Sequence, residues 1–407
     1  QLLVKAYPHS TYMLFCEALS DNAEEKGNSS QGVDPQTYLI NVQTYKYQDV
    51  QNVSSDSPVA YWDSCYAAIA AANQALAYCS GPDSANFTAQ KGEALVCRAY
   101  AHFMLVTLFA KAYDPATAAN FPGVPYVKTV STHVFDTSDR GTMASVYANI
   151  ESDLTQGMAL IQDKIYGTTP KFHFTLEAAH AFASRFYLFK RDYAKAVAHS
   201  TAVFGSSDPA SLLRDQTTIY NTLQYNDIKI LYNSSFNNAN ILLQEVSSAY
   251  PYNYYNYRYG YGQKLYSMLF YYDNVTGGSY SMSTYGATPQ YYNFPKFDQQ
   301  VVPLLSMEEV LLNRAEANIY LKNYDAAIAD LNGIQRLYMT EGRRKDVEYI
   351  YKYVLSKTQN PELRNYAYGH LAQAEIQVTN ADQAIATLRQ SLDENLTRLN
   401  NAANTKQ

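Results

Sequence analysis

The segment YPYNYYNYRYGY, residues 250–261, contains seven tyrosines in twelve positions and a single charged residue, Arg258. A sugar ring has an apolar C–H face on which an aromatic ring can stack, and hydroxyl groups that a tyrosine hydroxyl can hydrogen-bond. The asparagines in the segment add amide donors and acceptors, and the arginine adds a fork of donors. The pattern therefore predicts a shallow ligand surface. Its predicted contact residues are Tyr252, Asn253, Tyr254, Tyr255, Asn256, Tyr257, Arg258, Tyr259, Tyr291 and Tyr292.

The order of the tyrosines suggests how this surface is arranged. In an extended chain alternate side chains point the same way, and the doubled Tyr254-Tyr255 shifts that phase, so we expect two rows of rings with a bulge between them. Fourteen tyrosines lie between residues 250 and 292. The alternative is that these rings are structural and pack the region against the rest of the protein. In that case Tyr38, Tyr45 and Tyr47 are the next candidates for a ligand platform.

The sequence contains no constellation typical of an enzyme. Glycoside hydrolysis needs two carboxylates across a cleft, whereas Glu308 and Glu309 are adjacent at a predicted helix start, where acidic residues favour the helix dipole. His173 and His180 are seven residues apart and share a face only if one helix carries both. No H-E-x-x-H, G-x-S-x-G, phosphate-loop or dinucleotide-binding motif occurs. We predict a protein that is not an enzyme and that uses no cofactor or metal.

The composition excludes some partners. The formal net charge of the 407 residues is −6, and no basic stripe exists for a nucleic-acid backbone. Charged residues make up only 17% of the chain, and tyrosine is abundant, with 40 Tyr against 16 Phe and 1 Trp. No apolar stretch approaches the roughly 18 residues that span a bilayer. The four cysteines lack C-x-x-C spacing, and we interpret them as small buried thiols.

A helical repeat surrounds the tyrosine-rich region. EALVCRAYAHFML (93–105) and EVLLNRAEANIYL (309–321) both place apolar or small residues at three- and four-residue spacing, with an Arg-Ala pair at matching positions. EAAHAFASRFYLF (177–189) is a looser copy. DYAKAVAHS (192–200), NYDAAIADL (323–331) and NADQAIATL (380–388) are candidates for the second helix of a hairpin. This pattern is typical of tetratricopeptide-like hairpins, which bury their apolar faces by stacking. Generic helical hairpins are the alternative.

We therefore predict a mainly α fold, a tetratricopeptide-like helical repeat scaffold with a large irregular, Tyr-rich, ligand-facing region. A single domain is expected over residues 1–344. Its helical scaffold covers about 1–24, 57–115, 143–205 and 304–337, and its irregular insertions cover about 25–56, 116–142 and 206–303. Structureless connections of this length are usually functional or disordered, and the aromatic content argues against disorder. Residues 345–407 are expected to form an additional helical hairpin or cap.

Several segments together resemble the SusD/RagB family of outer-membrane nutrient-binding lipoproteins. They are AYPHSTYMLFCEALSDNA (6–23), YWDSCYAAIAAANQAL (61–76), GEALVCRAYAHFMLVTLF (92–109), FPGVPYV (121–127) and LLSMEEVLLNRAEANIYLKNYDAAIADLNGIQ (304–335). The resemblance covers roughly residues 1–340 and is most specific in the two Arg-Ala helices. It departs in a shorter irregular region and after YMTEGRRKD (338–346), where a Trp-Asp-Leu-Arg-like segment is replaced by another helical pattern.

The resemblance implies a non-catalytic protein of the cell surface, held on the outer membrane by a lipid. It implies capture of oligosaccharides, which pass to a SusC-type TonB-dependent transporter as the main protein partner. It also implies a lipidated cysteine upstream of Gln1 as the only membrane attachment. Two alternatives remain open: a peptide-binding member of the same family, and a helical-repeat scaffold for protein interactions.

Overall fold

The computed structural model describes residues 2–21, 23–25, 35–130, 138–215, 219–220, 223, 225–248, 258–260 and 301–338. The α-helices are α1 (Met13–Ala18), α2 (Pro35–Tyr45), α3 (Pro58–Tyr78), α4 (Thr88–Phe109), α5 (Met143–Met158), α6 (Leu176–Phe189), α7 (Tyr193–Phe204), α8 (Tyr225–Tyr232), α12 (Met307–Tyr320) and α13 (Tyr324–Tyr338). The strands are β1 (Glu24–Glu25), β2 (Asn240–Glu245), β3 (Tyr259–Gly260) and β4 (Val301–Ser306). Six short 3-10 helices are also present, η1 (Leu3–Lys5), η2 (Ser84–Phe87), η3 (Ala118–Asn120), η4 (Asp163–Tyr166), η5 (Pro170–Phe172) and η6 (Pro209–Leu212).

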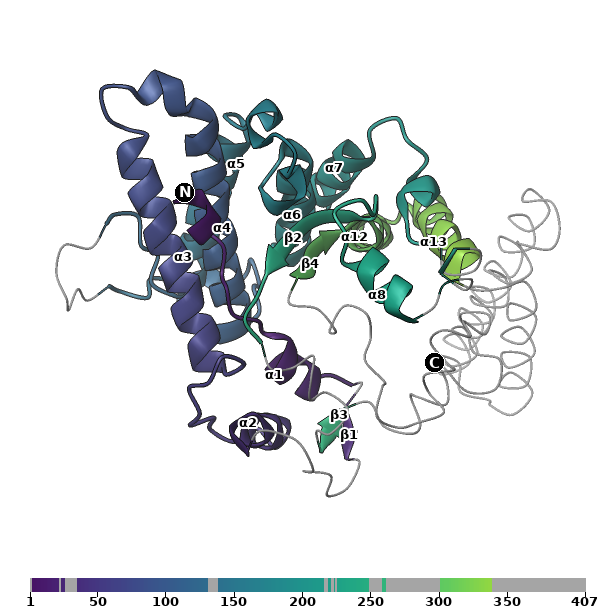
Figure 1. Ribbon diagram of the computed structural model, residues 1–407, viewed down its shortest axis with the longest axis horizontal. Helices are drawn as coiled ribbons and strands as arrows, with labels where there is room; N and C mark the ends of the chain where they lie inside the picture. The colour runs from purple at the N-terminus through teal and green to yellow at the C-terminus, as the bar shows by residue number, and fades with distance from the viewer. Residues whose placement is uncertain are drawn as a thin grey trace, which may run out of the picture.

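The predicted mainly α fold is confirmed. Helices α3, α4 and α5 pack successively, α6 pairs with α7, and α12 packs against α6, α7 and α13 (Figure 1). The described strands form two small antiparallel pairs, β1 with β3 and β2 with β4. The tetratricopeptide-like character of the stack stays a prediction, and its last copy, with the whole of residues 345–407, lies outside the described residues.

The two described copies of the hairpin share one turn. Arg191 after α6 and Lys322 after α12 both have a φ of 63°, in the left-handed region. In each turn the next residue donates its N–H to a carbonyl five residues back, from Asp192 to Tyr187 at 2.9 Å and from Asn323 to Asn318 at 2.8 Å. This is the hydrogen bond of a Schellman cap. The sequence match between DYAKAVAHS and NYDAAIADL therefore corresponds to a shared backbone geometry.

The arginines of the Arg-Ala helices join neighbouring helices. Arg98 on α4 donates two hydrogen bonds to the Asp153 carboxylate on α5, at 2.7 and 2.8 Å. Arg314 on α12 makes the same two-pronged contact with Asp330 on α13, at 2.9 and 2.6 Å. Bidentate pairs of this kind fix both the distance and the orientation of the partners. Each arginine is therefore committed to the scaffold.

Helix α4 forms the centre of the core. The expectation that no apolar stretch approaches a bilayer span is wrong, because Ser84–Phe109 is long and apolar enough to cross a membrane by length and composition. However, 83% of its most apolar window is buried inside the protein. It is therefore a core helix. Close packing against α5 depends on Gly92 and Gly157, because a Cβ at Gly157 would lie 2.7 Å from the Gly92 carbonyl oxygen. A side chain at either position would push the two helices apart.

Two helices lie inside segments that the sequence predicted to be irregular. Helix α2 falls within residues 25–56, and α8 falls within residues 206–303. The buried face of α2 carries Thr37, Ile40, Asn41 and Thr44, so three of its four residues are polar. An apolar 3.6-residue periodicity is therefore absent, although the helix is present.

Smaller predictions are resolved by the same packing. The lone tryptophan, Trp62, packs at the edge of the core with its ring 5.1 Å from that of Phe109. All four cysteines are free, and Cys65, Cys79 and Cys97 are buried while Cys16 is partly exposed. Burial raises the pKa of the Cys65 thiol to about 12, which keeps it protonated and unreactive.

Candidate ligand-binding surface

The tyrosine-rich region leaves the scaffold and returns to it at one end of a strand pair. Glu245, the last residue of β2, pairs with Val301, the first residue of β4. We call residues 246–300, which lie between them in the chain, the tyrosine-rich excursion. The strand pair holds the two ends of this segment side by side. Its first residues are also fixed, because the Ser247 N–H donates to the His9 carbonyl at 2.7 Å and the Ser248 hydroxyl donates to Asp56 at 2.6 Å.

A second attachment holds the excursion at Tyr259, 14 residues after Glu245. Strand β3 pairs with β1, and the Asn41 side chain on α2 brackets Tyr259. The Asn41 amide donates to the Tyr259 carbonyl at 2.8 Å and accepts from the Tyr259 N–H at 3.0 Å. The Tyr259 ring stacks on that of Tyr45 with centroids 3.8 Å apart and an interplanar angle of 11°. A helix side chain thus takes the place of a neighbouring strand.

Two of the ten predicted contact residues are described by the structure, and both take part in this attachment. Tyr259 is only 2% exposed, so its ring faces the protein. Arg258 pairs with Glu25, and its hydrogen bond to that carboxylate raises the pKa of the guanidinium above its usual value. The other eight lie outside the described residues, and the prediction that they contact a ligand stays open. They are Tyr252, Asn253, Tyr254, Tyr255, Asn256, Tyr257, Tyr291 and Tyr292.

The alternative platform divides into two kinds of tyrosine. Tyr45 is covered by the Tyr259 ring, and Tyr38 lies partly buried on the same helix, where its hydroxyl interacts with Arg258. Tyr47, just beyond α2, is 84% exposed. Its φ of 53° is that of the C′ residue of a Schellman cap, a position that favours glycine. A large exposed ring at this position is a candidate ligand contact beside the β3 attachment.

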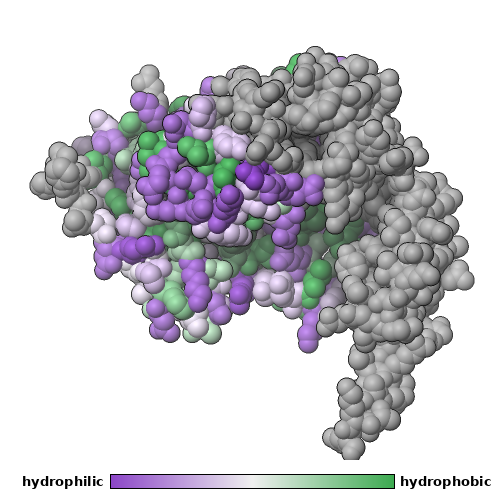
Figure 2. Space-filling model, turned by 90° about the horizontal axis from the view of Figure 1, so that it is seen from below, coloured by the Kyte–Doolittle hydropathy of each residue, from purple (hydrophilic) through white to green (hydrophobic). Residues whose placement is uncertain are grey.

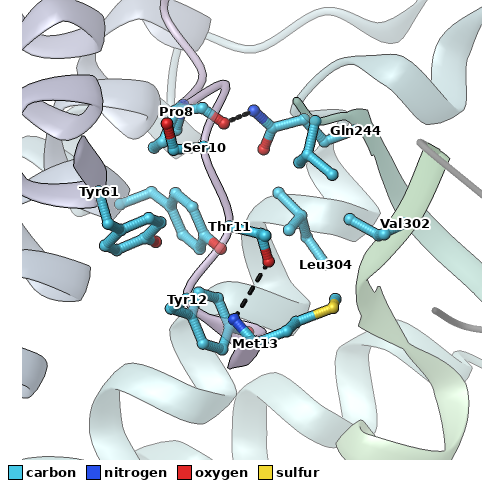
Figure 3. A pocket seen from close by; sticks show the side chains of 11 residues that line it. Pro8, Ser10, Thr11, Tyr12, Met13, Tyr61, Gln244, Val302 and Leu304 are labelled. Atoms are coloured by element: carbon cyan, nitrogen blue, oxygen red, sulfur yellow. Dashed lines mark hydrogen bonds between the residues drawn. The ribbon is translucent and has the colours of Figure 1, made fainter. Parts of the chain in front are cut away.

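A small pocket lies at the foot of the excursion, between the N-terminal segment, helices α3 and α4, and the β2–β4 pair (Figure 3). Figure 3 shows the rings of Tyr12 and Tyr61 on one side and Leu304 and Val302 on the other, with Gln244 donating to the Pro8 carbonyl. The space available to the centre of a water molecule is about 10 Å³, enough for one water and too small for a sugar ring. The pocket therefore belongs to the packing that holds the base of the excursion.

One buried hydroxyl in this pocket is left over. Tyr100 is buried, and its hydroxyl has no hydrogen-bond partner among the described residues. Burial raises its pKa above the usual value, so the hydroxyl stays neutral and remains a donor. A water in the 10 Å³ space is the natural partner for it.

The acidic pair at the start of α12 has a larger role than the helix dipole alone. Ser306 is the N-cap residue, and both acids lie in the first turn, as predicted. In addition, Glu308 pairs with Arg214 at 2.6 Å, and Glu309 accepts two hydrogen bonds from Arg185 on α6, one from Nε and one from Nη2 at 2.5 Å. Sequence reasoning missed both partners, because each lies about a hundred residues away in the chain.

The FPGVPYV segment is held rigidly by three helices. His102 on α4 accepts the Val127 N–H at its Nε2 at 3.0 Å, and its Nδ1 lies 2.9 Å from the Arg98 carbonyl. Asn73 on α3 donates to the Val127 carbonyl at 3.1 Å, and the Tyr126 hydroxyl reaches Asp153 on α5. Burial lowers the pKa of His102 to about 4, so the ring is neutral and its Nε2 can accept.

His173 and His180, which could share a face only if one helix carried both, have different partners. His173 precedes α6 and its Nδ1 lies 2.7 Å from the buried Glu93 carboxylate, while His180 on α6 faces His199 on α7 with 2.9 Å between their Nδ1 atoms. Within the described ranges, no three His, Cys, Asp or Glu side chains group closely enough to hold a metal ion.

Comparisons with known proteins agree with this architecture. A family model described as SusD-like, starch-binding associating with outer membrane, matches residues 2–188. A SusD superfamily protein from Bacteroides thetaiotaomicron has a TM-score of 0.59 at 16% identity, covering 92% of this chain and 83% of its own. A putative sugar binding protein from Bacteroides vulgatus has a TM-score of 0.58 at 19% identity, covering 82% and 76%. A laminarin binding SusD-like protein has a TM-score of 0.52 at 18% identity, covering 95% and 91%. No curated protein sequence matches significantly.

Proposed function

We propose that the chain is a member of the SusD/RagB family and a non-catalytic cell-surface protein that captures oligosaccharides and passes them to a SusC-type TonB-dependent transporter. The observation that supports the proposal is the way the tyrosine-rich excursion is mounted. Its base is closed by the β2–β4 pair, and Tyr259, 14 residues after Glu245, is fixed by Asn41 and β1. Anchoring of this kind reduces the conformational entropy that a loop loses when it binds a ligand.

A binding role without catalysis is supported by the use made of the carboxylates. Asp153, Asp330, Glu308 and Glu309 are each paired with an arginine that holds two parts of the scaffold together. A general acid must lie within hydrogen-bond reach of the group that it protonates. These four carboxylates are instead engaged with arginines of the scaffold.

The surface location is part of the same proposal. In the view of Figure 2 the coloured residues alternate between hydrophilic and hydrophobic patches, without a broad apolar belt. We propose attachment to the outer membrane through a lipid on a cysteine upstream of Gln1, with the transporter as the protein partner.

Affinity electrophoresis against starch, laminarin, xylan and pectin tests the function, with reducing-sugar release measured on the same panel. We expect retardation by at least one polysaccharide and no sustained release. Sustained release that a single carboxylate substitution abolishes would overturn the non-catalytic role. Failure to bind any polysaccharide, together with calorimetric binding of mixed tryptic peptides, would move the ligand class to peptides.

A further inference from the structure

Phe236 is the most exposed large hydrophobic side chain among the described residues, at 91% exposure. It lies at the outside of the turn between α8 and β2 (Figure 1), in the sequence NSSFNNAN, residues 233–240. A single exposed apolar residue needs no explanation by itself. The turn that carries Phe236, however, is fixed by many hydrogen bonds. An exposed ring on a fixed turn does need an explanation.

Two buried asparagines hold the turn from inside. The Asn237 amide donates to the Tyr220 hydroxyl at 2.7 Å and to the Leu231 carbonyl at 3.1 Å, and its side-chain oxygen accepts the Ala239 N–H at 3.0 Å. The Asn240 amide donates to the Tyr232 and Ser234 carbonyls at 2.8 and 2.9 Å. Apart from the bond to the Tyr220 hydroxyl, these hydrogen bonds join the two side chains to backbone groups of the turn that carries the exposed ring.

Two cations complete the support. Lys171 donates to the Asn237 carbonyl at 2.6 Å, and Arg214 donates to the Asn240 side chain while pairing with Glu308 of α12. The Phe236 N–H itself donates to the Ser234 hydroxyl at 3.1 Å. Asn237 is thus tied to η5, Asn240 is tied through Arg214 to the scaffold helix α12, and the Phe236 N–H bonds within its own turn. The backbone that carries the ring is held in place, although the ring itself packs against little of the protein.

The surroundings of the ring indicate what it binds. The exposed neighbours Ser235 and Asn238 are uncharged and carry hydrogen-bonding groups, and residues 231–240 contain no charged side chain. A protein-binding aromatic anchor sits within a wider apolar patch. One ring with an amide and a hydroxyl beside it matches instead the apolar face and hydroxyl fringe of a sugar.

We propose that Phe236, with Ser235 and Asn238, forms a second glycan-binding site. It rests on the proposed function, because its ligand is of the same class. Its turn precedes β2, whereas the tyrosine-rich excursion begins at the other end of that strand. The five residue steps from Asn240 to Glu245 span about 17 Å. A glycan bound at both sites gains avidity over one bound at either.

Laminarin and soluble starch are the probes, measured by calorimetry with wild-type protein, Phe236→Ala, Asn238→Ala and the control Tyr78→Ala. Tyr78 is also strongly exposed, at 68%, but it ends α3 and lies outside this turn. We expect about tenfold weaker binding in Phe236→Ala, a smaller loss in Asn238→Ala, and wild-type binding in Tyr78→Ala. Hydroxyl-radical footprinting of the wild-type protein should show Phe236 protected by the bound glycan and Tyr78 unprotected.

The outcomes separate this site from the function as a whole. Wild-type affinity in Phe236→Ala, together with an unprotected Phe236, overturns the second site and leaves the proposed function standing. If the wild-type protein binds none of starch, laminarin, xylan and pectin, both the second site and the capture of polysaccharides are overturned. Because the ring is 91% exposed, its truncation should leave the thermal unfolding midpoint unchanged, and the footprint does not depend on any variant.

Discussion

Replacing Asn41 by alanine should release β3, in the first part of the tyrosine-rich excursion, from the scaffold. The side-chain amide of Asn41 bonds both the N–H and the carbonyl of Tyr259, a residue that is 2% exposed. Leaving a buried backbone group without a partner costs about 1–3 kcal/mol. Water will reach part of this site once the side chain is gone, so we take the lower half of the range. Two groups then give about 3 kcal/mol for the attachment of β3.

That free energy corresponds to an increase of roughly a hundredfold in the opening equilibrium of β3. Hydrogen exchange measured by mass spectrometry reports it, because the Tyr259 amide exchanges only when its bond to Asn41 opens. We expect exchange at this amide to speed up by about that factor in Asn41→Ala. Asn41→Asp should fall between the two, because its carboxylate still accepts the N–H but cannot donate to the carbonyl.

Asn73→Ala is the matched control. Asn73 is another buried helix asparagine that donates to two loop carbonyls, those of Val127 and Thr129. Its loss should leave exchange at Tyr259 unchanged. If Tyr259 exchanges at the wild-type rate in Asn41→Ala, the attachment does not depend on the asparagine and the reasoning is wrong. If exchange rises but glycan affinity is retained, anchoring is real but does not contribute to binding.

Three further outcomes follow from the same structure. His102 has a folded pKa of about 4, below its ordinary 6.5, so its contribution to stability is complete above pH 6.5 and is lost as the pH falls toward 4; urea unfolding across that range should show a loss of about 3 kcal/mol that is absent in His102→Gln. Asp153→Ala leaves the Arg98 guanidinium buried without its bidentate partner and should lower the free energy of unfolding by about 3–5 kcal/mol, whereas a drop below 1 kcal/mol would contradict the pairing. The double change Tyr255→Ala and Tyr257→Ala should weaken glycan binding at least tenfold in calorimetry with an unchanged unfolding midpoint; a sharply lowered midpoint would instead identify these rings as structural.

The parts of the fold that could be predicted are those that depend on residues close together in the sequence. The apolar spacing and the Arg-Ala pairs of 93–105 and 309–321 identify α4 and α12, and the matching hairpin copies correspond to turns with the same φ. These features depend on contacts within a helix or with the next one. A single sequence records such contacts as periodicity, so they can be read without any partner being known.

The attachments that define the candidate surface could not be read in this way. Asn41 and Tyr259 are 218 residues apart, and Arg185 and Glu309 are 124 apart. A single sequence carries no periodic trace of such a pair. The residue types of Arg258 and Tyr259 suit a sugar and predict ligand contacts, whereas their partners within the protein, Glu25 and Asn41, lie in a segment predicted to be irregular. Phe236 has a readable signal, an aromatic ring among turn-forming Asn and Ser residues, but one such ring is inconspicuous in a chain with forty tyrosines.

The division between a helical scaffold and a candidate ligand surface should let the surface residues be substituted more freely than the scaffold residues. The helices are joined by bidentate ion pairs and by a glycine contact, which tolerate little substitution. Among the described residues, the tyrosine-rich excursion is attached at its base and at β3. We expect the rest of the excursion to accept substitutions without loss of the helical stack, because loops tolerate change better than the elements they connect. Stacking on a sugar face tolerates many sugars, and hydroxyl geometry discriminates among them. Exchanging the excursion between relatives, cut at the Glu245–Val301 pair, should therefore transfer glycan preference while leaving the unfolding of the helical stack unchanged.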